Sequence, residues 1–144
     1  MSYHELDDLK PARLSEAELV QLTNDTAGGT TIVTATYESA RDDAEAEIDG
    51  YIGARYTLPL GSTPALIKRL SMIITIYHLY RRRFAEGVPE GIRVDYKDAV
   101  RMLERLSDGT MTLGVQPAEA QNSERKAQTV SSAPVFSRSS LKDF

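Results

Sequence analysis

Residues 47–60 read EIDGYIGARYTLPL, and this stretch decides how the two helices on either side of it meet. Two glycines, Gly50 and Gly53, stand at the end of an acidic segment whose spacing predicts a helix. Glycine in a helix interior costs about 1 kcal/mol relative to alanine, so both need a reason. The Leu-Pro-Leu exit around Pro59 turns the chain away. We therefore predict a corner at which the glycines either admit close approach of the next helix or end the first one.

Further side chains of this corner are expected to hold it in place. Tyr51 and Tyr56 each combine an apolar ring with a hydroxyl group, so we expect both to be anchors with a polar tip. Arg55 is expected to form an ion pair. The predicted corner-packing set is Gly50, Tyr51, Gly53, Arg55, Tyr56 and Pro59.

Hydrophobic periodicity predicts a long helix on each side of the corner. Apolar and aromatic residues recur every three or four positions from residue 37 to about 56, and carboxylates cover the rest of that surface. Downstream, Thr63 and Pro64 fit the N-cap and N1 positions of a helix that reaches about residue 84. That second helix is apolar over most of its circumference, so we expect it in the centre of the core or between subunits.

Shorter elements complete a mainly α fold. Ser15 and Glu18 form a capping-box pattern that predicts a helix of two to three turns, and a further helix is predicted from Pro89 to about residue 107. Between the short first helix and the long helix that begins at residue 37, the Gly/Thr-rich residues 26–36 predict an extended arm. We expect a small bundle of two long helices plus shorter ones, forming a helical domain over residues 1–115.

Residues 116–144 differ in composition from the rest of the chain. They are rich in Ser, Gln, Ala and Thr and contain few large apolar side chains, which is typical of a segment that does not fold alone. We expect an extended C-terminal tail that becomes ordered on a partner. Its candidate anchors are Val135, Phe136, Leu141 and Phe144.

Composition excludes several classes of site. The chain has no cysteine, which rules out disulfides, thiolate zinc sites and cysteine nucleophiles, and its two histidines leave little for a metal centre. We predict no catalytic residue, cofactor site or metal site, and therefore no enzyme. The net charge of −4 argues against a broad basic face for nucleic acid. The longest apolar run is too short to span a bilayer and no signal peptide is evident, so we expect a soluble protein made in a reducing cytoplasm.

Three adjacent arginines, Arg81, Arg82 and Arg83, form the sharpest polar cluster. Successive helical residues point about 100° apart, so the three cannot form one face. Their interpretation stays open between contact with phosphate, salt bridges to a neighbouring subunit, and stabilisation of a helix C-terminus through its dipole. The second interpretation predicts that copies in a ring place this cluster against the acidic helix, at Asp42 and Glu45.

Four segments together carry a family resemblance. They are HELDDLKPARLSEAELVQLTND, ARDDAEAEIDGYIGARYTLPL, LIKRLSMIITIYHLYRRR and YKDAVRMLERLSDGTMTLG, and they span about residues 4–114. The chain resembles the neck proteins of Mu-type and related long-tailed phages, known as head–tail connectors or adaptors. The second segment, with Asp-Gly-Tyr followed by Arg-Tyr and Leu-Pro-Leu, is the most specific of the four.

The resemblance implies a helical bundle that assembles as a ring, commonly of twelve subunits, beneath the portal protein in the neck of the virion. Such a ring extends the DNA channel without sequence-specific binding and offers a surface to the next neck, tail terminator or tail completion protein. In related connectors the C-terminal segment often reaches the portal, which fits a partner-ordered tail here. The family brings no catalytic residues, no cofactor and no membrane contact.

An alternative from another class stays open. A small helical DNA-binding or regulatory module would use the arginine cluster Arg81–Arg83 and bind duplex DNA in a salt-dependent way.

Overall fold

The computed structural model describes residues 2–10, 13–84 and 87–115 of the 144-residue chain. This part contains five helices and no strand: α1 Leu6–Leu9, α2 Glu16–Thr23, α3 Thr34–Ile52, α4 Ala65–Arg83 and α5 Glu90–Asp108. The prediction of a mainly α bundle is confirmed, although three helices rather than two are long, each with 19 residues. The predicted tail, with Val135, Phe136, Leu141 and Phe144, lies outside the described residues.

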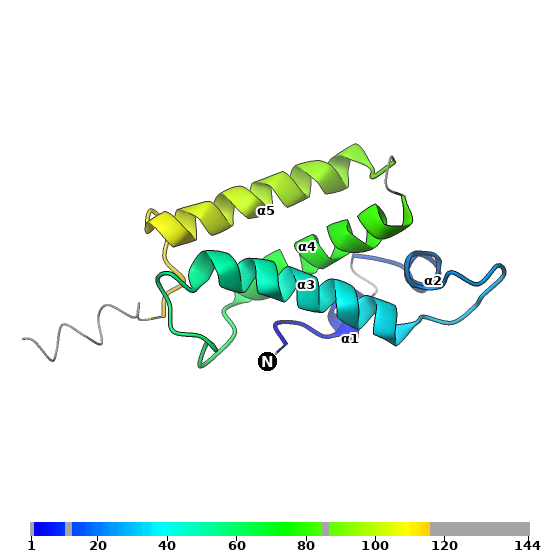
Figure 1. The fold of residues 1–144 in the computed structure, drawn as a ribbon, viewed down its shortest axis with the longest axis horizontal. Coiled ribbons are helices and arrows are strands. Elements are labelled where there is room, and N and C mark those ends of the chain that lie inside the picture. The colour runs from blue at the N-terminus through cyan, green and yellow to red at the C-terminus, as the bar shows by residue number, and fades with distance from the viewer. Residues whose placement is uncertain (1, 11–12, 85–86, 116–144) are drawn as a thin grey trace, which may run out of the picture.

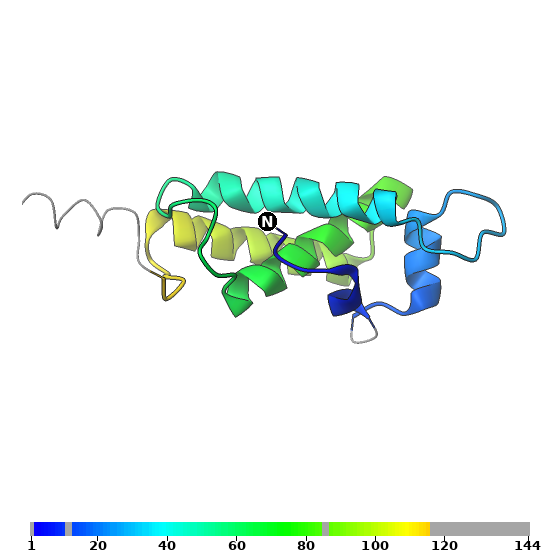
Figure 2. The same cartoon turned by 90° about the horizontal axis from the view of Figure 1, so that it is seen from below.

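The three long helices lie side by side, and α2 stands across the end of the bundle at which α3 begins (Figure 1). Figures 1 and 2 place α5 and the N-terminal segment with α1 on opposite sides of the α3–α4 pair. Within the described residues, no helix is long and apolar enough to cross a membrane.

Helix α4 is the centre of the core, as its all-round apolar surface predicts. Its first half buries Ile67 and Leu70 against residues of α3 and α5. Its second half buries Leu79 against the N-terminal segment, α2 and the start of α3. One helix therefore joins two hydrophobic clusters, and burial of its apolar side chains is the main stabilising contribution of the fold.

Helix α2 begins where the sequence predicts. The Ser15 hydroxyl accepts a hydrogen bond from the Glu18 backbone N–H at 3.3 Å, and Glu18 Oε2 accepts one from the Ser15 N–H at 2.8 Å. These bonds satisfy donors that a helix start leaves free. The Ser15 hydroxyl, 2.7 Å from Glu18 Oε2, and the Ser15 N–H both hydrogen-bond this carboxylate and lower the pKa of Glu18. Leu14, just before the N-cap, and Leu19, in the first turns of α2, are both buried.

The predicted arm at 26–36 is shorter than expected, because α3 already begins at Thr34. Burial of Tyr37 in the first turn of α3 outweighs the β preference of the threonine run. The remaining loop is held by side chains that precede it: Asn24 Nδ2 donates to the Thr31 carbonyl at 2.9 Å, and Thr23 Oγ1 accepts from the Val33 N–H at 3.1 Å.

The corner between α3 and α4 forms through Gly53. The helix ends at Ile52 rather than near residue 56, and a Cβ on Gly53 would lie 2.8 Å from the Asp49 carbonyl oxygen. Gly53 therefore ends the helix, one of the two predicted roles. Gly50 is different, because no heavy atom lies within 4 Å of the place its Cβ would take. The alternative prediction, that α4 approaches closely at Gly50, is therefore wrong.

Beyond the corner, α4 begins one residue later than predicted. Pro64 has extended backbone angles and occupies the N-cap position, so Ala65 is the first helical residue. Pro59, which follows a cis peptide bond, is exposed in the connecting loop.

Candidate functional site

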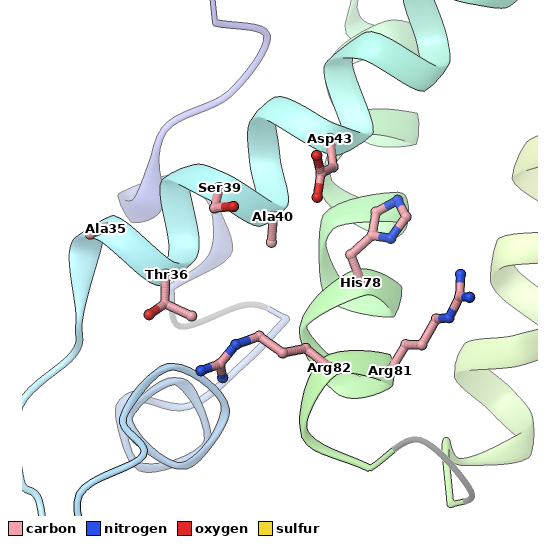
Figure 3. A pocket seen from close by; sticks show the side chains of 8 residues that line it. All are labelled: Ala35, Thr36, Ser39, Ala40, Asp43, His78, Arg81 and Arg82. Atoms are coloured by element: carbon pink, nitrogen blue, oxygen red, sulfur yellow. The ribbon is translucent and has the colours of Figure 1, made fainter.

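An open groove lies between the N-terminal half of α3 and the C-terminal half of α4 (Figure 3). Its volume is about 600 Å³. We call it the α3–α4 groove and define it by its eight lining residues: Ala35, Thr36, Ser39, Ala40, Asp43, His78, Arg81 and Arg82.

The groove exists because its two walls differ in side-chain size. On α3 the spacing of Ala35, Thr36, Ser39 and Ala40 places four small side chains on one helix face. The wall on α4 carries the long side chains of Arg81 and Arg82, which point away from one another (Figure 3). The small residues leave the space, and Arg81, Arg82 and His78 on α4 and Asp43 on α3 complete its lining.

The three arginines of the cluster differ in their contacts. Arg82 forms an ion pair with Asp25 and donates to the Leu22 carbonyl at 3.2 Å, and Arg83 pairs with Asp25 at 2.9 Å. Both arginines thus tie the end of α4 to α2 and its following loop. Arg81 is exposed and forms no ion pair within the described part of the chain. The structure therefore leaves one of the three cations, rather than a cluster, available at the groove.

Asp42 and Glu45, the predicted acidic partners in a neighbouring subunit, both lie near Arg41. Its guanidinium is 3.1 Å from Asp42 Oδ1 and 3.9 Å from Glu45 Oε1. The Asp42 side chain is 66% exposed, whereas that of Glu45 is 15% exposed. Burial raises the pKa of Glu45, and its carboxylate also accepts the Tyr3 backbone N–H at 2.6 Å. Asp42 remains accessible to a neighbour, but Glu45 is largely engaged inside the chain.

A polar cluster joins all three long helices beside the groove. The Tyr96 hydroxyl donates to Glu47 Oε1 at 2.9 Å, and Glu47 Oε2 lies 3.3 Å from His78 Nε2. The Tyr96 ring stacks on Tyr77 with centroids 3.9 Å apart. Burial and the Glu47 carboxylate raise the pKa of Tyr96 to about 12, so it stays a hydrogen-bond donor at neutral pH. The partner of His78 lies 31 positions away in the sequence, so no local pattern could have indicated it.

The N-terminal segment closes another part of the α3–α4 surface. His4 is buried, and its Nδ1 lies 2.9 Å from Ser71 Oγ on α4. Lys68 pairs with Asp8 at 2.7 Å. Burial lowers the pKa of His4 to about 4, so the ring is neutral at physiological pH.

The corner residues have packing roles. Tyr56 is buried, and its hydroxyl accepts the Leu113 backbone N–H at 3.1 Å. Tyr51 packs against the same core in a partly buried position. The predicted ion pair of Arg55 is not found among the described residues. Its guanidinium lies instead over Gly109, where a Cβ would be 1.6 Å from Arg55 Nη1, so a side chain there would have to displace it.

Comparison with known proteins covers almost the whole chain. Residues 3–132 match the family described as "Bacteriophage Mu, Gp36". "Gene product J" of Escherichia phage Mu is 37% identical over 141 residues, which is 96% of this chain and 96% of the relative. "Mu-like prophage FluMu protein gp36" of Haemophilus influenzae is 35% identical over 111 residues, which is 76% of each chain. The matched region includes the groove, the corner and both core clusters.

Proposed function

The chain belongs to the bacteriophage Mu Gp36 family, and from this membership we propose that it is a structural virion protein that serves as a head–tail adaptor. In this role, copies of the chain form a ring of about twelve beneath the portal protein. The ring extends the DNA channel and presents a surface to the next neck or tail protein, so the protein resides in the virion neck.

The observation that carries this proposal is the extent of the family match, which runs from residue 3 to residue 132. Both named relatives are phage or prophage proteins by their names. An adaptor acts through its shape, and the packing around α4 supplies a rigid body for that task. The open α3–α4 groove is a surface that a neighbouring protein can cover.

Two parts of the chain are proposed to fold onto neighbours. The loop before α3 projects beyond the bundle in both views (Figures 1 and 2). The tail at 116–144 carries the four apolar anchors expected to reach the portal, namely Val135, Phe136, Leu141 and Phe144. Segments that fold on binding can cover large surfaces at a modest net affinity.

The test is to disrupt the reading frame in an inducible prophage that carries it, and to examine the particles by electron microscopy and mass spectrometry. We expect DNA-filled heads without attached tails, and restored tailed particles when the intact gene is supplied in trans. In particles with the intact gene, we expect the protein at the neck. Normal tailed particles from the disrupted prophage, or purified virions that lack the protein, would refute the proposal.

A further inference from the structure

The α3–α4 groove has an unsatisfied cation at its edge. Arg81 lines the groove, is exposed, and has no ion-pair partner within residues 2–10, 13–84 and 87–115. The small α3 side chains opposite it, such as Ala35 and Ser39, leave space for an apolar group from another molecule. A ridge that presents an apolar side chain between carboxylates would therefore complement the groove in shape and charge.

Helix α5 carries such a ridge among its exposed residues, with Asp98 at the edge that faces α4. Val94 is 44% exposed and, with Phe84, is one of two large hydrophobic residues exposed in the described structure. Glu90 and Asp98 lie one turn before and one turn after Val94, so the three side chains form a row along the helix. The buried residues of α5, Ala99, Leu103 and Leu106, lie on another face of the helix, and Val94 belongs to neither core cluster of the described residues.

The two flanking carboxylates can change partners at little cost. Glu90 pairs with Arg93, and Asp98 pairs with Arg101 at 3.0 Å, each three positions along the same helix. Exposed pairs of this kind contribute about 0 to 1 kcal/mol. Asp43, an exposed carboxylate of the groove, offers an acceptor for Arg101 when Asp98 turns to Arg81.

We propose that the Glu90–Val94–Asp98 row of one copy docks in the α3–α4 groove of the next copy. Val94 packs on the small residues of α3, and Asp98 pairs with Arg81. This contact supplies the subunit interface of the proposed adaptor ring and rests on that function for its biological role. The groove and the row are different surfaces, so each copy offers one of each and the contact continues from copy to copy. Packing a row of side chains into a helix–helix groove is the ordinary geometry of helix association.

The absence of cysteine from the chain gives a clean cross-linking test. The variants Ser39→Cys and Val94→Cys are mixed as full-length proteins and treated with a short bis-maleimide. We expect a mixed cross-linked dimer at a yield at least several-fold above that of a control mixture of Ala65→Cys with Val94→Cys, because Ala65 is exposed but lies at the other end of α4. Equal yields in the two mixtures would overturn the proposal. So would preferential Ser39→Cys self-cross-linking, which would indicate a twofold contact between α3 helices.

Charge reversal tests the pairing itself. Arg81→Glu on the Ser39→Cys chain, or Asp98→Arg on the Val94→Cys chain, should each lower the cross-linking yield about tenfold. Combining the two should restore it, whereas additive losses would overturn the Asp98–Arg81 pairing. Thermal melts confirm that each variant is folded. Failure of the interface and failure of the adaptor role give different results. Virions that contain the ring but yield no Ser39→Cys/Val94→Cys cross-link refute only the interface. Virions that lack the protein refute only the adaptor role.

Discussion

The N-terminal segment covers one part of the α3–α4 surface, whereas the α3–α4 groove leaves another part of it open. Under the N-terminal segment, two polar side chains of α4 have partners inside the chain: Lys68 pairs with Asp8, and Ser71 lies within hydrogen-bond distance of His4. At the groove, small side chains leave space and Arg81 stays without an ion pair among the described residues. The closed region stabilises the monomer, and the open region is available to other molecules. Mutations should therefore affect folding at the first and assembly at the second.

The largest expected effect comes from Leu9, which is 0% exposed in the cluster beneath the N-terminal segment. Leu9→Ala removes buried methyl groups and leaves a cavity, so we expect a loss of about 3 kcal/mol in the free energy of unfolding. Urea denaturation measures this loss. The matched variant is Val94→Ala on the open face, which should stay within about 0.5 kcal/mol of the wild type. Similar losses in both variants would break the distinction between the two regions.

Acid should weaken the closed region through His4. Burial, assisted by the nearby Arg41 charge, lowers the pKa of His4 to about 4 in the folded protein, against an ordinary value of 6.5. Between these values the unfolded chain binds a proton that the folded protein does not. Stability is therefore complete above about pH 6.5 and falls towards pH 4, by about 3 kcal/mol.

Because other carboxylates also titrate in this range, the measurement is a comparison of slopes. Denaturation of the wild type and of His4→Phe is followed from pH 7 to pH 4.5, and the variant should lose less stability over that interval. Parallel slopes would show that His4 is as accessible to protons in the folded protein as in the unfolded chain.

A smaller effect is expected at Asp25, which holds both Arg82 and Arg83. These side chains are partly exposed, so Asp25→Ala should cost about 0.5–1 kcal/mol, observed as a modest fall in melting temperature. The variant also tests the DNA-binding alternative, since it frees Arg82 and Arg83 from Asp25 beside the already unpaired Arg81. We expect no retardation of duplex DNA at physiological salt by the wild type or the variant. Salt-dependent binding that strengthens in Asp25→Ala would favour a nucleic-acid role.

The smallest effect on stability is expected from the tail. The described core residues lie between Tyr3 and Val115, so deleting residues 130–144 should change the free energy of unfolding by less than about 0.5 kcal/mol. The same deletion should abolish attachment to the portal, measured by co-sedimentation with portal complexes. A truncated protein that still co-sediments would place the portal contact on the bundle instead.

The helices were predictable because their signals are local. The capping box at Ser15 and the apolar circumference of α4 are each visible within a few helical turns of sequence. The N-terminal attachment was not, because His4 meets a residue 67 positions away. The same reason hid the Arg82–Asp25 pair, 57 positions apart. The groove depends on which residues of α3 and α4 face one another, and no local pattern records that.

Gly50 makes the isolated chain less stable than it could be. It lies inside α3, is exposed, and its missing Cβ would touch nothing. Alanine at this position would lower the entropy of the unfolded chain at no steric cost, a gain of about 1 kcal/mol that the protein has not taken up. A more heat-resistant form for structural work is therefore one methyl group away. If the Gly50→Ala variant were to impair particle formation, the backbone at Gly50 would be in contact with a neighbouring protein in the particle.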